Sequence, residues 1–124
     1  MKNARTFIEF IDKYNINHVV VTNTSLENVN FFKSKVPMLN KIKNWITRED
    51  YKHAKPNSEC YELAKIKYYN NEKYIIGFEN TIIGYNAIKN ITECVYIMTN
   101  KDACDYNEIK NQDVYLIDDF LDIQ

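Results

Sequence analysis

The stretch Ile75-Ile-Gly-Phe-Glu-Asn-Thr-Ile-Ile-Gly-Tyr-Asn-Ala87 decides the fold of this 124-residue chain. It begins in an apolar strand candidate, Lys73–Phe78, and passes without a hairpin turn into a helical segment near 82–90. Both glycines of the chain, Gly77 and Gly84, lie inside it. Glycine weakens a strand or helix by about 0.5–1 kcal/mol relative to alanine. Their clustering therefore indicates a backbone requirement here, with tight strand–helix packing as the alternative explanation.

Strand and helix candidates also alternate along the rest of the chain. Short β-branched or apolar runs predict strands, and helical periodicity with capping residues predicts helices between them. Thr24-Ser-Leu-Glu27, for example, has the spacing of a capping box that opens a helix. The expected strands are His18–Thr22, 44–47, Lys73–Phe78, Glu93–Met98 and Asp113–Ile117, and the expected helices are 2–15, 25–34, a shorter one ending at Lys43, one from Asn57 or Ser58 to about Tyr69, 82–90 and 102–109.

This order of elements predicts the α/β class. Strand and helix in alternation, without hairpin turns, are typical of a doubly wound, three-layer fold around a mainly parallel sheet. A length of 124 residues allows one domain and leaves little room for a second. The chain also has no repeat and no linker-like stretch, so we expect a single domain over residues 1–124.

Charge and composition argue against several partners. The 16 basic and 17 acidic residues give a net charge of −1, which attracts neither nucleic acid nor an anionic membrane. No apolar run approaches the roughly 20 residues that span a bilayer, and Met1–Phe10 lacks the apolar core of a signal peptide. Cys60, Cys94 and Cys104 show no CxxC spacing, and an odd count is a poor disulfide framework. We therefore expect a cytoplasmic, reducing environment, with no nucleic-acid or membrane partner.

Polar residues follow two of the expected strands. In doubly wound folds ligands bind beyond the carboxyl ends of the strands. Thr22 and Asn23 end one such strand, and Glu79 and Asn80 end another. Each also has a structural explanation: Thr22 suits a β-branched strand end beside a helix cap, and Glu79-Asn80 suits a polar turn with Thr81 as N-cap.

Three segments, taken in order, resemble a known family. They are Val19-Val-Val-Thr-Asn-Thr24, His53-Ala-Lys-Pro-Asn-Ser58 and the stretch from Ile75 to Ala87, and Ile46-Thr-Arg-Glu-Asp-Tyr51 resembles the approach to the second of them. They resemble the second, third and fourth motifs of the haloacid dehalogenase (HAD) superfamily, in its phosphoglycolate phosphatase-like and β-phosphoglucomutase-like branch. A single lysine is usually a solvated surface charge, but the adjacent Pro56 and the ordered motifs favour a site role for Lys55. The resemblance covers nearly the whole chain and implies a Rossmann-like HAD core.

The resemblance implies a role for each matching residue. HAD enzymes transfer a phosphoryl group through an aspartyl-phosphate, with Mg²⁺ neutralising the phosphoryl oxygens. Thr22 would donate its hydroxyl to a phosphate oxygen, helped by free backbone N–H groups of Asn23 and Thr24. Lys55 would neutralise the phosphoryl group and hold the nucleophile. Glu79 and Asn80 would orient Mg²⁺ directly or through water, and the substrate would be a phosphorylated small molecule.

Two departures from the family pattern limit the expected activity. The first motif, Asp-x-Asp after an apolar strand, does not occur upstream of Thr22, and the cap domain that usually follows it is missing too. Asn80 also stands where the family usually has an aspartate. The chain therefore resembles the carboxyl-terminal part of a HAD core, without its first strand and cap, and we expect it to be inactive alone with Mg²⁺ bound weakly or not at all.

The missing strand has a structural consequence. In the family it lies between the strand ending at Thr22 and the strand ending near Phe78. We therefore expect that these two strands either pair directly or receive a strand from a second chain or an N-terminal segment. One alternative is a degenerate HAD-like module that binds phosphate or a protein without catalysis. A receiver-like α/β domain is a weaker alternative, because Thr22-Asn23 carries no carboxylate.

Overall fold

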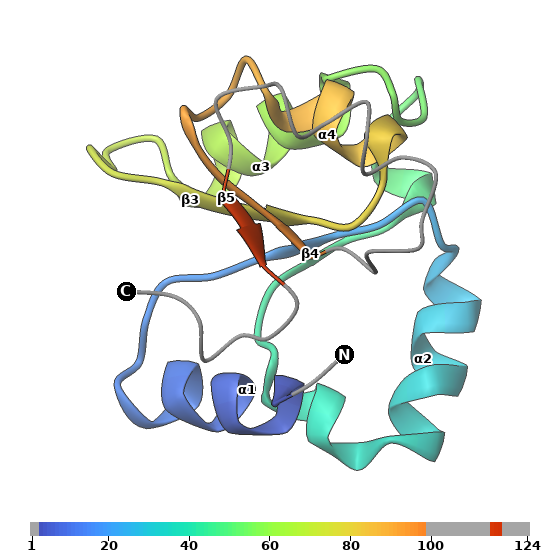
Figure 1. Ribbon diagram of the computed structural model, residues 1–124. Helices are drawn as coiled ribbons and strands as arrows, with labels where there is room; N and C mark the ends of the chain where they lie inside the picture. Colours follow the sequence, from blue (N-terminus) through green and yellow to red (C-terminus); the bar gives the residue numbers. More distant parts are fainter. Residues whose placement is uncertain (1–2, 99–114, 118–124) are drawn as a thin grey trace.

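The computed structural model describes residues 3–98 and 115–117, and Figure 1 shows how its helices and strands are arranged. The predicted order of helices and strands is confirmed within these residues, except that a short helix at Arg48–Asp50 was not predicted. The helix expected near 102–109 lies outside them. The helices are α1 (Ala4–Lys13), α2 (Leu26–Lys35), α3 (Glu59–Tyr68) and α4 (Ile82–Ile88), with short 3-10 helices η1 (Pro37–Lys41) and η2 (Arg48–Asp50), and the strands are β1 (Val20–Val21), β2 (Trp45–Ile46), β3 (Ile76–Glu79), β4 (Cys94–Met98) and β5 (Tyr115–Ile117).

The strands form two sheets, and every pairing in them is parallel. One sheet has the order β1-β2 and the other the order β3-β4-β5. In Figure 1, α3 and α4 lie on one side of the strands, and α1 and α2 lie on the other. The α/β class with parallel strands is therefore confirmed. Within the described residues no strand pairing joins β1 to β3, so the direct pairing that we considered does not occur.

The second sheet carries an aromatic row on the face that α1 covers. Phe78 on β3 stacks on Tyr96 of β4, with ring centroids 5.5 Å apart, and Tyr96 stacks on Tyr115 of β5 at 4.8 Å. Phe7 of α1 meets Phe78 edge to face at 5.3 Å. Cross-strand aromatic pairs stabilise a sheet by burying large apolar surfaces against one another. The row therefore joins β3, whose last residue is Glu79, to β4 and β5.

The start of α2 differs from the predicted capping box. Ser25, not Thr24, is the N-cap, and its side chain accepts a hydrogen bond from the Asn28 N–H at 3.2 Å. The carboxylate that closes this end is Glu49, which accepts from the Leu26 N–H at 3.0 Å. The helix therefore begins one residue later than the box would place it. A carboxylate at this end is favourable because the helix dipole is positive there.

Most of the buried apolar residues form two clusters on the α3 and α4 side. Ile46, Tyr51, Cys60 and Ala64 make up the first, which packs between the β1-β2 sheet and α3. The second lies between α4 and β4 and contains Tyr85, Ile88, Val95 and Ile97. Tyr61 of α3 packs against both clusters.

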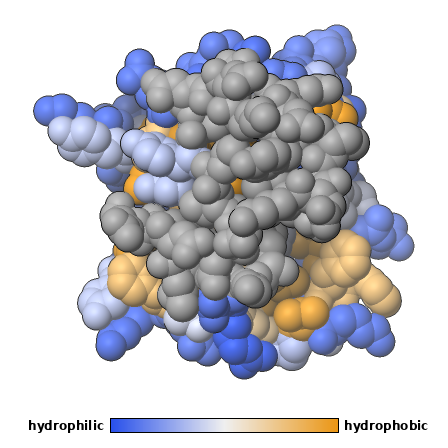
Figure 2. Space-filling model, viewed as in Figure 1, coloured by the Kyte–Doolittle hydropathy of each residue, from blue (hydrophilic) through white to orange (hydrophobic). Residues whose placement is uncertain are grey.

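On the α1 and α2 side, the described residues are less buried. Among the described residues α1 has no buried side chain, and α2 exposes large apolar side chains. Figure 2 shows this apolar surface in orange around α2. The exposed set on α2 is Leu26, Phe31 and Phe32.

Candidate functional site

Lys55 reaches across the carboxyl ends of both sheets. It lies between η2 and α3, and its peptide bond to Pro56 is cis. Its Nζ donates to the Val21 carbonyl at the end of β1 at 3.0 Å and to Glu79 Oε1 at the end of β3 at 2.8 Å. The side chain is only 11% exposed and that of Glu79 only 7%. A nearly buried ammonium therefore bridges the carboxyl ends of β1 and β3.

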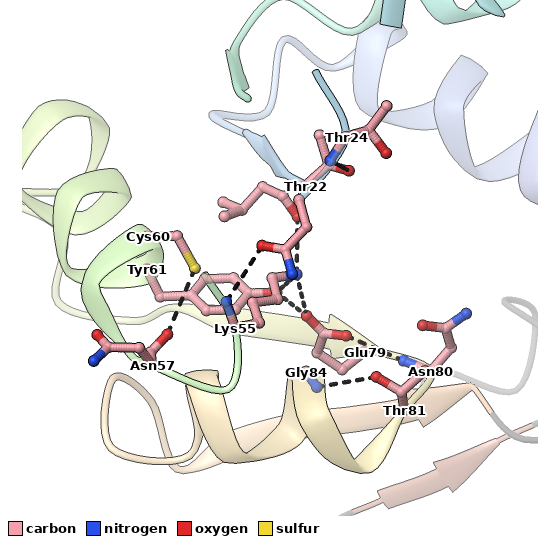
Figure 3. A network of polar contacts seen from close by, with 12 residues as sticks. Thr22, Thr24, Lys55, Asn57, Cys60, Tyr61, Glu79, Asn80, Thr81 and Gly84 are labelled. Carbon is pink, nitrogen blue, oxygen red and sulfur yellow. Dashed lines mark hydrogen bonds and ion pairs between the residues drawn. The ribbon is translucent and has the colours of Figure 1, made fainter. Parts of the chain in front are cut away.

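Tyr61 completes this contact from the first turns of α3. Its hydroxyl accepts a hydrogen bond from Lys55 Nζ at 3.2 Å and donates one to Glu79 Oε1. The Lys55 ammonium also lies 4.8 Å from the centre of the Tyr61 ring, within range of a cation–π contact. Figure 3 shows the three side chains converging from separate elements. We call Lys55, Tyr61 and Glu79 the central triad.

Because Gly84 has no side chain, the Glu79 carboxylate can occupy the space beside it. A Cβ at position 84 would overlap the carboxylate, with Oε1 at 2.7 Å and Cδ and Oε2 closer still. Thr81 caps α4 by accepting from the Gly84 N–H at 3.0 Å, so the structural role expected for Thr81 is confirmed. At Gly77 the lack of a side chain serves a different purpose, because a Cβ there would meet the Ile88 side chain of α4. The glycine cluster thus serves strand–helix packing at Gly77 and the site at Gly84.

The segment after β1 is ordered by hydrogen bonds of its own. The single O–H proton of Tyr51 is shared between two acceptors, the Thr22 carbonyl at 2.8 Å and Asn23 Oδ1. The Lys55 backbone N–H also donates to Asn23 Oδ1, at 3.3 Å. Thr22 Oγ1 accepts from the Thr24 N–H at 3.0 Å. The expectation that the Thr24 N–H is free for a phosphate is therefore wrong, while the Thr22 hydroxyl keeps its own proton to donate.

Burial sets the protonation of the tyrosine hydroxyls. It raises the pKa of Tyr61 well above the ordinary value, and the charge of Glu79 and its hydrogen bond act in the same direction. Burial also raises the pKa of Tyr51. Both phenols therefore stay neutral at physiological pH and act as hydrogen-bond donors.

The structure brings together part of the predicted site. Lys55 and Glu79 are in direct contact, and Asn23 contacts the Lys55 backbone. Thr22 directly follows β1, one residue after the carbonyl that Lys55 contacts. The backbone nitrogen of Asn80 lies 3.4 Å from Glu79 Oε2, and Asn80 is exposed.

Two members of the site were not predicted from the sequence as polar partners. Tyr61 was not singled out in the sequence as a site residue, and Tyr51 was expected only to belong to the approach to Lys55. Both hydroxyls contact residues 18 or more positions away. The available signal was weak: a tyrosine at an inward helical position needs a partner for its hydroxyl when it is buried.

The described residues do not by themselves fit a resident Mg²⁺. Glu79 Oε1 is already engaged by Lys55 and Tyr61, and Oε2 lies against Gly84. Asn80 would add a neutral amide oxygen in place of a second carboxylate. Within residues 3–98 and 115–117, no group of three or more His, Cys, Asp or Glu side chains is placed to hold a metal ion. Mg²⁺ usually needs one or two carboxylates together with phosphate oxygens.

Comparisons with known proteins leave the family open. No model of a protein family matches the chain, and a search of curated proteins finds no match either. None of the helices in the described part of the chain has the length and apolar character needed to cross a membrane.

Proposed function

We propose that this chain is the carboxyl-terminal part of a HAD-like phosphoryl-transfer core, with a three-layer, doubly wound, Rossmann-like arrangement. Lys55 would bind the phosphoryl group of a phosphorylated small molecule, with the Thr22 hydroxyl as a second donor and Asn23 beside it. The observation that carries the proposal is the nearly buried Lys55 ammonium at the carboxyl ends of β1 and β3. A desolvated cation with directed donors is what recognition of a phosphate dianion requires.

The proposal includes a strand supplied by a second chain or by an N-terminal segment. β1 and β3 belong to parallel sheets that have no pairing with each other in the described residues. A further parallel strand between them would join the sheets and satisfy the backbone groups of both edges. If its last residues carried the Asp-x-Asp that this chain lacks upstream of Thr22, the nucleophile would lie near Lys55.

A second candidate is a module that binds a phosphate or a protein without turnover. Glu79 is the carboxylate that contacts Lys55, and it is engaged by the ammonium and by Tyr61. A carboxylate held in this way is a poor nucleophile, because the ion pair and the hydrogen bond stabilise its charge. This observation favours binding over catalysis for the chain taken alone.

Binding of inorganic phosphate tests what both candidates share. Orthophosphate is titrated into the chain and followed by ³¹P NMR, with Lys55→Met as the test variant and Lys52→Met as the control. The Met variants keep an unbranched side chain one atom shorter and remove one charge, and Lys52 is exposed. We expect loss of binding in Lys55→Met alone. Equal binding by both variants would contradict the proposed site.

Turnover separates the two candidates. An aryl phosphate is offered with Mg²⁺ to the chain alone and to the chain mixed with a peptide whose apolar strand ends in Asp-x-Asp. Hydrolysis that needs both the peptide and Lys55 is the outcome expected for the phosphoryl-transfer core. Phosphate binding without hydrolysis in either mixture favours the binding module.

A further inference from the structure

All three N–H donors of the Lys55 ammonium have acceptors within hydrogen-bond distance. A lysine ammonium carries three N–H donors, and here the Val21 carbonyl, the Tyr61 hydroxyl and Glu79 Oε1 lie at 3.0, 3.2 and 2.8 Å from Nζ. The shortest of these contacts is to the one charged partner. An incoming anion must therefore replace an existing partner before it can contact Nζ directly.

Glu79 is the partner that an anion would replace. It carries the same sign of charge as a phosphate, so the two compete for one cation, and at short range in a site of low polarity they repel each other. The Val21 carbonyl is fixed in the backbone of β1. Tyr61 is held in place by two apolar clusters, so its hydroxyl is also poorly able to withdraw.

We propose that Glu79 is an internal competitor that closes the site: it occupies the Lys55 ammonium, and a phosphate monoester or inorganic phosphate binds by displacing it. This inference rests on the proposed function, because it concerns the same ammonium. Tyr61 is a positioning residue in this switch. Its hydroxyl donates to the oxygen that Lys55 contacts, and so it holds Glu79 in the closed position.

The closed state explains the polar contacts of the triad better than a ready-made phosphate site does. In such a site the donors would converge on a position for the anion, with carboxylates kept at a distance. Here the phenol and the ammonium converge on Glu79 Oε1. Whatever withdraws Glu79 would therefore raise the affinity of Lys55 for phosphate.

The test compares phosphate affinity in two variants that loosen the closed state. Glu79→Gln removes the competing charge with little change in size, and Tyr61→Phe removes the hydroxyl while the ring still fills the space between the clusters. Glu62→Gln, on the exposed side of α3, makes the same change in charge away from Lys55 and serves as the control. Orthophosphate is the probe, measured by ³¹P NMR titration, and urea unfolding verifies that each variant is folded.

We expect Glu79→Gln to bind orthophosphate about tenfold more tightly than the parent chain, the factor that follows when one charge-assisted hydrogen bond need not be broken. Tyr61→Phe should also bind more tightly, by a smaller factor, and Glu62→Gln should match the parent. Equal or weaker binding in Glu79→Gln overturns the inference and leaves the proposed function standing if Lys55→Met still abolishes binding. If Glu79→Gln does not fold, unchanged or weaker binding in Tyr61→Phe overturns it.

The failure of the proposed function has a different signature. Lys55→Met would then bind phosphate as well as the parent chain does. Absence of binding in the parent and in both loosened variants overturns the function and the inference together. Tighter binding in Glu79→Gln that is lost again in the Lys55→Met/Glu79→Gln double variant supports both.

Discussion

Substitution of Gly84 by alanine tests the geometry of the site through stability. Gly84 lies in the first turn of α4, where alanine would ordinarily stabilise the helix by about 0.5–1 kcal/mol. Here the new Cβ would occupy the space of the Glu79 carboxylate, with Oε1 at 2.7 Å and other carboxylate atoms nearer. Glu79 must therefore move away from Lys55 and Tyr61.

The cost follows from the contacts that Glu79 would lose. Separating a buried ion pair, so that a charge remains without its partner, costs about 3–5 kcal/mol. The pair here is nearly buried, at 11% and 7% side-chain exposure. After the helix gain is subtracted, we expect Gly84→Ala to lower the free energy of unfolding by about 2–4 kcal/mol. That is a large part of the stability of a domain of this size.

Urea unfolding, followed by the fluorescence of the single tryptophan Trp45, measures this cost. The same substitution in a Glu79→Ala background should stabilise, because the clashing carboxylate is gone and the helix gain remains. Gly77→Ala is the matched control, since its Cβ would press on the flexible end of Ile88 instead of a charged group. A neutral or stabilising Gly84→Ala in the presence of Glu79 would refute the reasoning.

Three further predictions concern catalysis, metal and pH. The chain alone should not hydrolyse an aryl phosphate with Mg²⁺, and hydrolysis that Lys55→Ala abolishes would contradict this. Titration calorimetry should find no micromolar Mg²⁺ affinity, while Asn80→Asp should strengthen any weak binding and Glu79→Gln should remove it. The Leu26 N–H lowers the pKa of Glu49 in the folded state below its ordinary 4.5. The ionised Glu49 carboxylate therefore stabilises the folded state fully above its ordinary pKa, and this stabilisation is lost as the pH falls through the lowered pKa of the folded state. The urea midpoint should therefore fall less steeply between pH 6 and pH 2 in Glu49→Gln than in the parent chain.

The order of the elements could be predicted because it depends on local patterns. The β-branched run at His18–Thr22 and the apolar run before Glu79 need two covered faces, and the segments between them have helical spacing. The exact N-cap residue of a helix was harder to predict. Thr24 and Ser25 are both good N-cap residues, and the choice of Ser25 goes with a tertiary contact, since Glu49 reaches the first turn of α2 from η2.

The site was predictable as a location and not as a set of contacts. Thr22 and Glu79 could be placed near each other because both stand at strand ends that meet at one edge of a parallel sheet, whereas Lys55 was placed there only by the resemblance to the HAD motifs. The sequence carries no local sign that Tyr61 donates to Glu79 or that Tyr51 donates to Asn23, since these pairs are 18 and 28 positions apart. Such contacts are decided by packing, and packing is decided by the whole chain.

We infer that the central triad serves binding more than stability. A buried ion pair gains little net free energy, because desolvation of the two charges offsets their attraction, and apolar residues of similar size often serve as well or better. The two clusters that meet at Tyr61 already connect α3 to both sheets through apolar contacts. Lys55 and Glu79 add to this connection a charge pair that packing alone does not require. In our proposal another anion displaces the Glu79 carboxylate from this nearly buried cation, and the charge pair then suits a site that opens when its ligand binds.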